Sequence, residues 1–166
     1  EFANDFKANY KTLEGHICPN FSAWDLEYQD IRREKDWERD FDSLLNINQV
    51  PRFNSIWFIC DHTSGMYKGA YSPSAAVADN DLAVGRFLEH LSHSSIWPES
   101  AVFILEDDAQ NGADHVDAHR SIAFVASPYV RRNFIDHTMY STSSMMRTME
   151  LILGLPPMSQ YDAAAT

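Results

Sequence analysis

The residues with the clearest chemical potential lie in the range 105–120. Three consecutive carboxylates come first, a glycine-containing turn follows, and two histidines four residues apart come last: Glu106, Asp107, Asp108, His115 and His119. Adjacent anions repel one another unless a cation neutralises them. Carboxylates combined with imidazoles suit a divalent metal such as zinc, manganese or iron. The alternative is a solvated acidic loop, because charged turns are common on protein surfaces.

A calcium loop of the EF-hand type does not fit this stretch. Such a loop needs oxygen ligands at fixed positions that include the third and the twelfth. Counted from Asp107, the third position is Ala109 and the twelfth is Ala118, and neither side chain offers an oxygen. The nearby imidazoles also favour a transition metal over calcium.

A second polar cluster follows the apolar run 55–60, which has the length and composition of a buried strand. The cluster begins with Asp61 and His62. The run 101–105 predicts a second strand, and a helix lies between the two, so the order predicts a parallel βαβ unit with a right-handed crossover. Parallel neighbours end at the same sheet edge, where ligands bind. We therefore expect Asp61 and His62 to lie close to the carboxylates that follow residue 105.

The remaining pattern places these strands between helices. Apolar residues at helical spacing predict a helix over 30–46, with Trp37 and Phe41 on its buried face and charged residues, including Arg33 and Glu34, on a solvated face. Further elements are a helix that starts at Asp79–Asp81, a third strand over 121–126 and a helix from Ser141 or Thr142 to Leu153, with loops at 66–78 and 131–140. The expected fold class is α/β, with a mostly parallel sheet flanked by helices, in one domain of residues 1–166 with a lead-in of 1–49 and a core of 50–166.

Composition excludes some classes of function. The formal net charge of −11 argues against general nucleic-acid binding, which needs a basic surface. No run of about 18 apolar residues predicts a membrane span. Cys18 and Cys60 do not have the spacing of a metal-binding pair, and whether they form a disulfide cannot be deduced from the sequence. No signal peptide is visible at Glu1-Phe2, and this start favours a piece of a longer protein.

The chemistry expected at such a site is hydrolysis assisted by a metal. Asp107 and Asp108 would bind one or two ions with help from Asp61 or His62. One of the three adjacent carboxylates would not bind the metal itself but would orient a metal ligand through a hydrogen bond. The ions would hold phosphoryl oxygens and lower the pKa of a bound water or nucleophile. Two further histidines would complete the metal shell or protonate a leaving group, and these are His115 and His119.

The segment Asp107-Asp108, followed by Asp114-His115-Val116, resembles the metal motif of the phosphoesterase family that holds bacterial phospholipases C and acid phosphatases, a branch of the alkaline phosphatase superfamily. Other stretches are similar to that family in the same order: Asp61-His62-Thr63, Asp79-Asn80-Asp81, Ser127-Pro128-Tyr129-Val130, Asp136-His137-Thr138, Thr142 to Thr148, and Gly154-Leu155-Pro156-Pro157. The resemblance covers roughly residues 50–166. It is nearest to the version found after β-propeller repeats in bacterial surface or secreted proteins.

The resemblance implies that Asp107 and Asp108 bind metal and that His62 lies at the phosphate. It makes His115 part of the motif and carries over to His119 and His137 more weakly. It also implies an alkaline phosphatase-like α/β core, an extracytoplasmic location, and a phosphorylated small molecule or a phospholipid as substrate.

In that family the nucleophile and a first metal-binding pair precede the part matched here. We therefore expect an incomplete catalytic domain that lacks its nucleophile, is inactive alone, and has the missing half as a partner. The alternative is a non-catalytic surface or binding domain that keeps the same fold.

Overall fold

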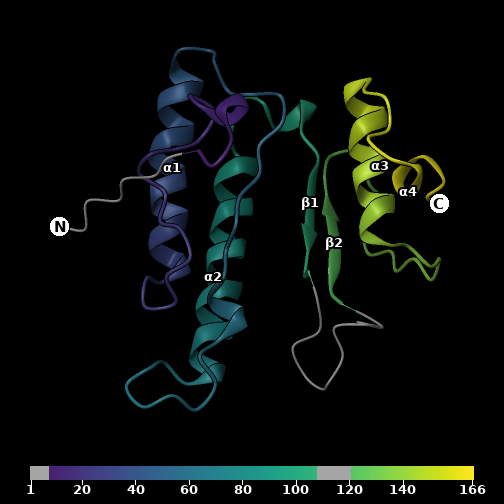
Figure 1. The fold of residues 1–166 in the computed structure, drawn as a ribbon. Helices are drawn as coiled ribbons and strands as arrows, with labels where there is room; N and C mark the ends of the chain where they lie inside the picture. Colours follow the sequence, from purple (N-terminus) through teal and green to yellow (C-terminus); the bar gives the residue numbers. More distant parts are fainter. Residues whose placement is uncertain (1–7, 108–120) are drawn as a thin grey trace. The chain divides into compact units, whose positions relative to one another are not determined.

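The computed structural model describes residues 8–107 and 121–166. The chain divides into two compact units, Glu1–Ser94 and Ser95–Thr166. Their helices and strands are labelled in Figure 1. Within the described ranges, the sheet consists of two antiparallel strands and most of the regular structure is helical. The predicted α/β fold with a mostly parallel sheet is therefore wrong.

The first unit is built on two long helices, α1 (Asp30–Asn46) and α2 (Pro73–Ser92). Aromatic side chains form the contact between them. Trp37 stacks on Phe41 with ring centroids 4.8 Å apart, and Phe87 of α2 meets the Trp37 ring edge-on at 4.6 Å. The helix predicted over 30–46 is confirmed with its bounds, and Trp37 and Phe41 are buried as expected. A short 3-10 helix, η1 (Lys11–Leu13), precedes α1.

Helix α2 begins earlier than the sequence pattern predicted. Ser72 is its N-cap, with the hydroxyl accepting a hydrogen bond from the Ala75 N–H, and Pro73 occupies the first turn. Proline suits this position because its missing N–H would lack a helical partner there anyway. The predicted start at Asp79 is wrong, so Asp79 and Asn80 lie within the helix and their side chains serve other contacts.

The run 55–60 is not a strand. Residues 55–59 have no regular secondary structure, and the chain then turns through a second 3-10 helix, η2 (Cys60–His62). The backbone N–H groups of Ile59 and Cys60 donate to the side chain of Asp30, at 3.1 and 2.7 Å, and not to a neighbouring strand. The apolar character of the run reflects the burial of these two residues, whereas Trp57 is exposed.

The second unit contains a third 3-10 helix, η3 (Trp97–Glu99), and the strands β1 (Val102–Leu105) and β2 (Ala123–Ala126). The strands pair antiparallel, with Val102 opposite Ala126 and Leu105 opposite Ala123. The Glu106 N–H continues the ladder to the Ile122 carbonyl at 3.0 Å. Strands were therefore correctly expected at both places, but their direction was wrong. Parallel neighbours need a crossover connection, whereas antiparallel ones do not.

The C-terminal part of this unit is helical. Helix α3 (Thr142–Leu153) starts with a capping box between Ser141 and Ser144, and it ends at Gly154, which adopts the left-handed conformation with φ 72°. The predicted helix and its glycine stop are both confirmed. The short helix α4 (Gln160–Ala163) follows. Among all the helices described, none has the length and apolar character to cross a membrane.

Candidate functional site

The predicted site residues fall in different parts of the chain. Asp61 and His62 lie in η2 of the first unit, and Asp107 follows β1 in the second. The expectation that these segments meet depended on two parallel strands, but residues 55–60 form no strand and the one strand pair among residues 8–107 and 121–166 is antiparallel. The prediction that Asp61 and His62 lie beside the carboxylates after residue 105 therefore no longer has the strand geometry that supported it. Three more predicted site residues lie outside the described part of the chain, namely Asp108, His115 and His119.

Asp61 has one carboxylate oxygen fixed and the other open. Its side chain is half-buried, and Oδ1 accepts a hydrogen bond from Nδ2 of Asn80 at 3.2 Å. No hydrogen bond from residues 8–107 or 121–166 reaches Oδ2. A carboxylate that is oriented through one oxygen keeps the other available to a cation, which is how metal-binding carboxylates are commonly held.

His62 has a comparable arrangement. Its Nδ1 lies 2.9 Å from the Thr63 carbonyl oxygen, and a carbonyl can only accept, so Nδ1 carries the proton and donates. The lone pair therefore resides on Nε2 of an exposed ring. The Trp24 ring packs against the imidazole edge-on at 5.0 Å. A histidine whose Nδ1–H binds a backbone carbonyl presents Nε2 as a metal ligand or a proton acceptor.

A buried aspartate, Asp30, fixes the turn that presents both residues. It is fully buried, and its carboxylate accepts four hydrogen bonds. Oδ1 accepts from Nη1 of Arg33 at 2.9 Å and from the Ile59 N–H, while Oδ2 accepts from the Cys60 N–H and from Nδ2 of Asn80 at 3.0 Å. The two backbone donors directly precede Asp61, so the buried carboxylate sets the position of η2.

Arg33 balances the charge of Asp30 and is itself fully buried. Its guanidinium also donates to four backbone carbonyls of the preceding loop, those of Ser22, Ala23, Asp25 and Tyr28. The expectation that Arg33 and Glu34 lie on a solvated face is wrong, since Glu34 is also buried and burial raises the pKa of its carboxyl. The spacing of Asp30 and Arg33, three apart at the start of a helix, was the one signal of this pair in the sequence.

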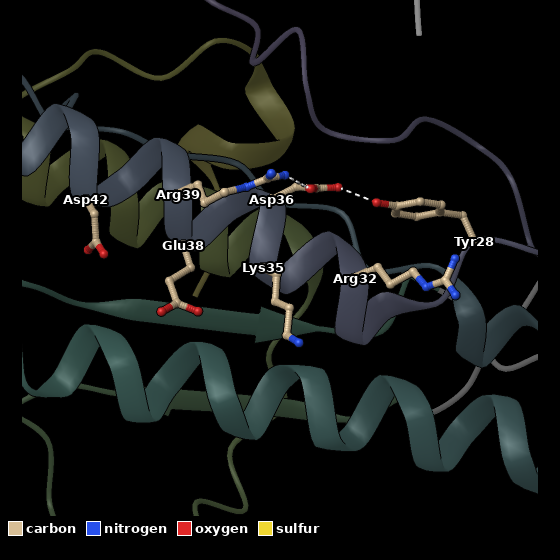
Figure 2. Close-up of a pocket in the computed structure, with 7 residues that line it drawn as sticks. All are labelled: Tyr28, Arg32, Lys35, Asp36, Glu38, Arg39 and Asp42. Atoms are coloured by element: carbon tan, nitrogen blue, oxygen red, sulfur yellow. Dashed lines mark hydrogen bonds and ion pairs between the residues drawn. The ribbon is translucent and has the colours of Figure 1, made fainter. Parts of the chain in front are cut away.

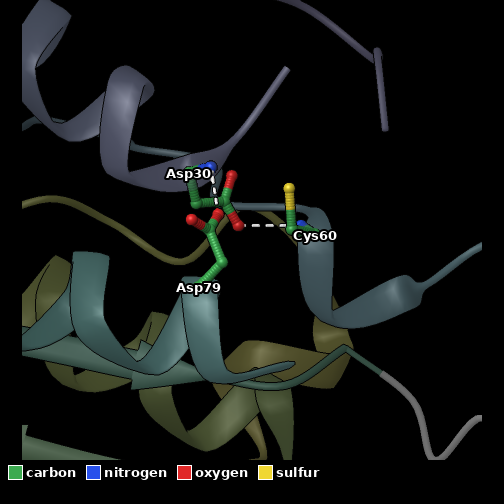
Figure 3. Close-up of side chains that lie close together, drawn as sticks. All are labelled: Asp30, Cys60 and Asp79. Carbon is green, nitrogen blue, oxygen red and sulfur yellow. Dashed lines mark hydrogen bonds between the residues drawn. The ribbon is translucent and has the colours of Figure 1, made fainter. Parts of the chain in front are cut away.

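A group of potential ligands occurs at the same place but does not suit a metal. One ligand atom each from Asp30, Cys60 and Asp79 lies within 4.8 Å of the others, and Figure 3 shows how these side chains face one another. The oxygens of Asp30 are already fully bonded. Burial, reinforced by the Asp30 charge, raises the pKa of the Cys60 thiol to about 11, so it stays protonated. Oδ2 of Asp79 accepts from the Asp30 N–H at 2.6 Å. The group is a helix cap.

The second such group lies between the two long helices. Nε2 of His90 is 2.8 Å from Oδ1 of Asp42, and its Nδ1 is 3.5 Å from Oε1 of Glu38. The contact between Nε2 and Asp42 has hydrogen-bond length and joins the two helices, and no further observation points to an ion at this group. A surface depression adjoins this group and is shown in Figure 2; it is lined by Tyr28, Arg32, Lys35, Asp36, Glu38, Arg39 and Asp42. Because acidic and basic side chains both line it, its charge favours neither an anion nor a cation.

Both cysteines, Cys18 and Cys60, have free thiols, so no disulfide joins them.

Comparison with protein-family models, with curated proteins and with solved structures gives no match to this chain. The open carboxylate oxygen of Asp61 and the open imidazole nitrogen of His62 are atom types that divalent transition metals bind.

Proposed function

We propose that this chain takes part in the metal-dependent hydrolysis of phosphoric esters. The observation that carries the proposal is the turn η2, where Asp61 Oδ2 and His62 Nε2 are both left open by contacts that fix their partner atoms. The same two residues belong to a tripeptide that matches the phosphoesterase pattern. The fully buried carboxylate of Asp30 fixes the backbone at the start of this turn.

The resemblance assigns metal binding to Asp107 and Asp108 and, more weakly, to His119, while the open oxygen of Asp61 makes it a further candidate ligand. A divalent ion at such ligands polarises a phosphoryl oxygen and lowers the pKa of bound water. The resemblance puts His62 at the phosphate and makes His115 a residue that would complete the metal shell or protonate a leaving group. The Nδ1–H of His62 is held by the Thr63 carbonyl, so its Nε2 is the atom that accepts a proton from, or passes one to, the reacting group.

The substrate class follows the resemblance and is a phosphorylated small molecule or a phospholipid, met outside the cytoplasm. We assign the nucleophile to no residue of this sequence. The chain is therefore expected to bind metal but to show no turnover of a phosphoric ester by itself. Robust hydrolysis of a nitrophenyl phosphate ester by these residues alone would contradict that assignment.

Metal binding by the full chain tests the proposal directly. Titration calorimetry with MnCl₂ and with ZnCl₂ is expected to show a saturable site. The variants Asp61→Asn and Asp107→Asn are expected to weaken binding by about tenfold or more, a loss of about 1.4 kcal/mol. Asp81→Asn is the matched control, because Asp81 is an exposed aspartate of α2. Equal affinity in all variants, or no binding by the unmodified chain, would favour the non-catalytic binding protein.

A further inference from the structure

The small sheet of the second unit has an open edge. Within the described part of the chain, strands β1 and β2 pair only with each other. Leu105 lies opposite Ala123, and at the next position the Glu106 N–H donates to the Ile122 carbonyl. In an antiparallel ladder, hydrogen-bonded pairs alternate with pairs whose N–H and C=O groups point away from the neighbouring strand. The N–H and C=O groups of Ala123 and Val125 therefore point away from β1.

The outer edge of β2 is apolar and unprotected. No hydrogen bond from residues 8–107 or 121–166 reaches the outward N–H and C=O groups of Ala123 and Val125. Both faces of the strand are open as well, since Phe124 is 60% exposed and Val125, on the opposite face, is 38% exposed. Natural proteins usually protect such an edge with a charged residue, a proline or a bulge. Residues 121–127 contain no charged residue and no proline, and the pairing with β1 is regular.

A second copy of the same strand fits this edge. A two-fold axis beside Phe124 makes the two β2 strands antiparallel and places Ala123 of each copy opposite Val125 of the other. Each outward N–H and C=O group then gains a hydrogen-bonding partner. The two Phe124 side chains face each other as a non-hydrogen-bonded pair, the arrangement in which cross-strand aromatic contacts are closest. The edge of β1 is less suitable, because its residues are half-buried and Glu106 and Asp107 follow it directly.

We propose that the chain forms a two-fold dimer in which the β2 strands of two copies pair antiparallel and join their sheets into one. The partner is a second copy because the register of this edge is self-complementary and residues 121–127 carry no charge that a copy would repel. The net charge of −11 opposes association at longer range. Added salt screens that repulsion, so the dimer is expected to strengthen as the NaCl concentration rises.

Sedimentation velocity of the full chain tests the dimer over micromolar to millimolar concentrations. The unmodified chain is expected to shift to twice the mass of one chain as its concentration rises. Phe124→Lys places two like charges opposite each other across the axis and is expected to stay monomeric. Ile135→Lys is the matched control, because Ile135 is an exposed apolar residue of the same unit outside both strands, and it is expected to dimerise as the unmodified chain does. Circular dichroism identifies the variants that stay folded.

Disulfide formation gives a second test that does not depend on a lysine at the edge being tolerated. The Cα atoms of a non-hydrogen-bonded antiparallel pair lie about 4.5 Å apart, within the range that a disulfide spans. With Cys18→Ser as the background, Phe124→Cys is expected to form a covalent dimer under mild oxidation at least about tenfold faster than Ile135→Cys, because paired thiols have a high effective concentration. Collision alone would favour Ile135→Cys, whose position is 76% exposed.

Three results would overturn the proposal. The first is a chain that stays monomeric at every concentration, in which case β2 remains solvated or accepts a strand from another protein. The second is equal dimerisation of folded Phe124→Lys and Ile135→Lys, which would place the contact on another surface. The third is a rate of covalent dimer formation by Phe124→Cys that does not exceed that of Ile135→Cys.

Discussion

Two arginines of α1 allow a controlled test of the buried pair at the start of the helix. Arg33 and Arg39 each pair with an aspartate three residues earlier, Asp30 and Asp36 respectively. The pairs share a helix and a spacing but differ in burial. The side chains of Arg33 and Asp30 are fully buried, whereas that of Arg39 is 73% exposed. Replacing each arginine by methionine therefore compares the same chemical change in two environments.

The expected losses of stability differ several-fold. Arg33→Met leaves Asp30 as an uncompensated buried charge, a change that typically costs about 3–5 kcal/mol. Arg39→Met removes an exposed partner, and Asp36, although buried, keeps its hydrogen bond from the Tyr28 hydroxyl at 2.7 Å, so the change is expected to cost about 0–1 kcal/mol. For a unit of this size, 1 kcal/mol corresponds to roughly 4–8 °C, so Arg33→Met is expected to lower the melting temperature by roughly 12–40 °C. Arg33→Lys keeps the charge but cannot reach all the loop carbonyls, and it is expected to fall between the two.

Urea unfolding followed by tryptophan fluorescence measures this difference. Three tryptophans lie in the first unit, at positions 24, 37 and 57, and they report on its unfolding. If Arg33→Met and Arg39→Met lower the free energy of unfolding by amounts within 1 kcal/mol of each other, the argument that Asp30 depends on Arg33 is wrong.

Three further predictions concern other positions. Burial raises the pKa of the Cys60 thiol from 9.0 to about 11, so the unfolded chain loses this proton first as pH rises. Stability is therefore expected to fall between about pH 9 and pH 11, by on the order of 3 kcal/mol. Comparing the pH dependence of unfolding in Cys60→Ala with that of the unmodified chain isolates this contribution. Gly154→Ala is expected to lower the free energy of unfolding by about 1–2 kcal/mol, because residue 154 is left-handed with φ 72°. Gly85→Ala, inside α2 with open space around it, is expected to raise the free energy of unfolding by about 0.5–1 kcal/mol. Thermal unfolding measures both. The hydrogen bond from Ser159 lowers the pKa of Asp162 to about 2. The stability that the ionised Asp162 gives the folded chain is therefore present above about pH 4 and is lost as pH falls toward 2. Asp162→Asn is expected to remove this acid dependence of unfolding, as followed by circular dichroism.

The helices were accessible to sequence analysis because local signals define them. The apolar spacing of Trp37 and Phe41 gave α1, and a serine cap with a glycine stop gave α3 between Ser141 and Gly154. For α2, Ser72-Pro73 is a start signal of the same kind, but the acidic cluster at residue 79 also has the composition of a helix start, and local sequence does not distinguish the two. Within a helix an aspartate can serve a different helix, as Asp79 does, and no local pattern shows this.

The run 55–60 and the buried pair could not be deduced in the same way. An apolar run of this length indicates burial but does not say what its N–H groups bind. Here they bind Asp30, a residue far back along the chain. Arg33 has the composition of a surface residue, and its burial follows from the loop carbonyls that surround it. The open atoms of Asp61 and His62 likewise depend on contacts made in three dimensions, which the sequence does not show.

The cap that Asp79 gives to α1 has a consequence for how this unit folds. Gln29, the residue before α1, makes no capping hydrogen bond with its own side chain, and the Asp30 N–H is satisfied from a residue 49 positions away. A synthetic peptide of residues 30–46 would lack this acceptor, so its first turn is expected to fray in water. Closing so long a loop carries an entropy cost that must be met before the cap forms. The first turn of α1 is therefore completed only when α2 docks, and the same docking brings Asn80 to Asp30.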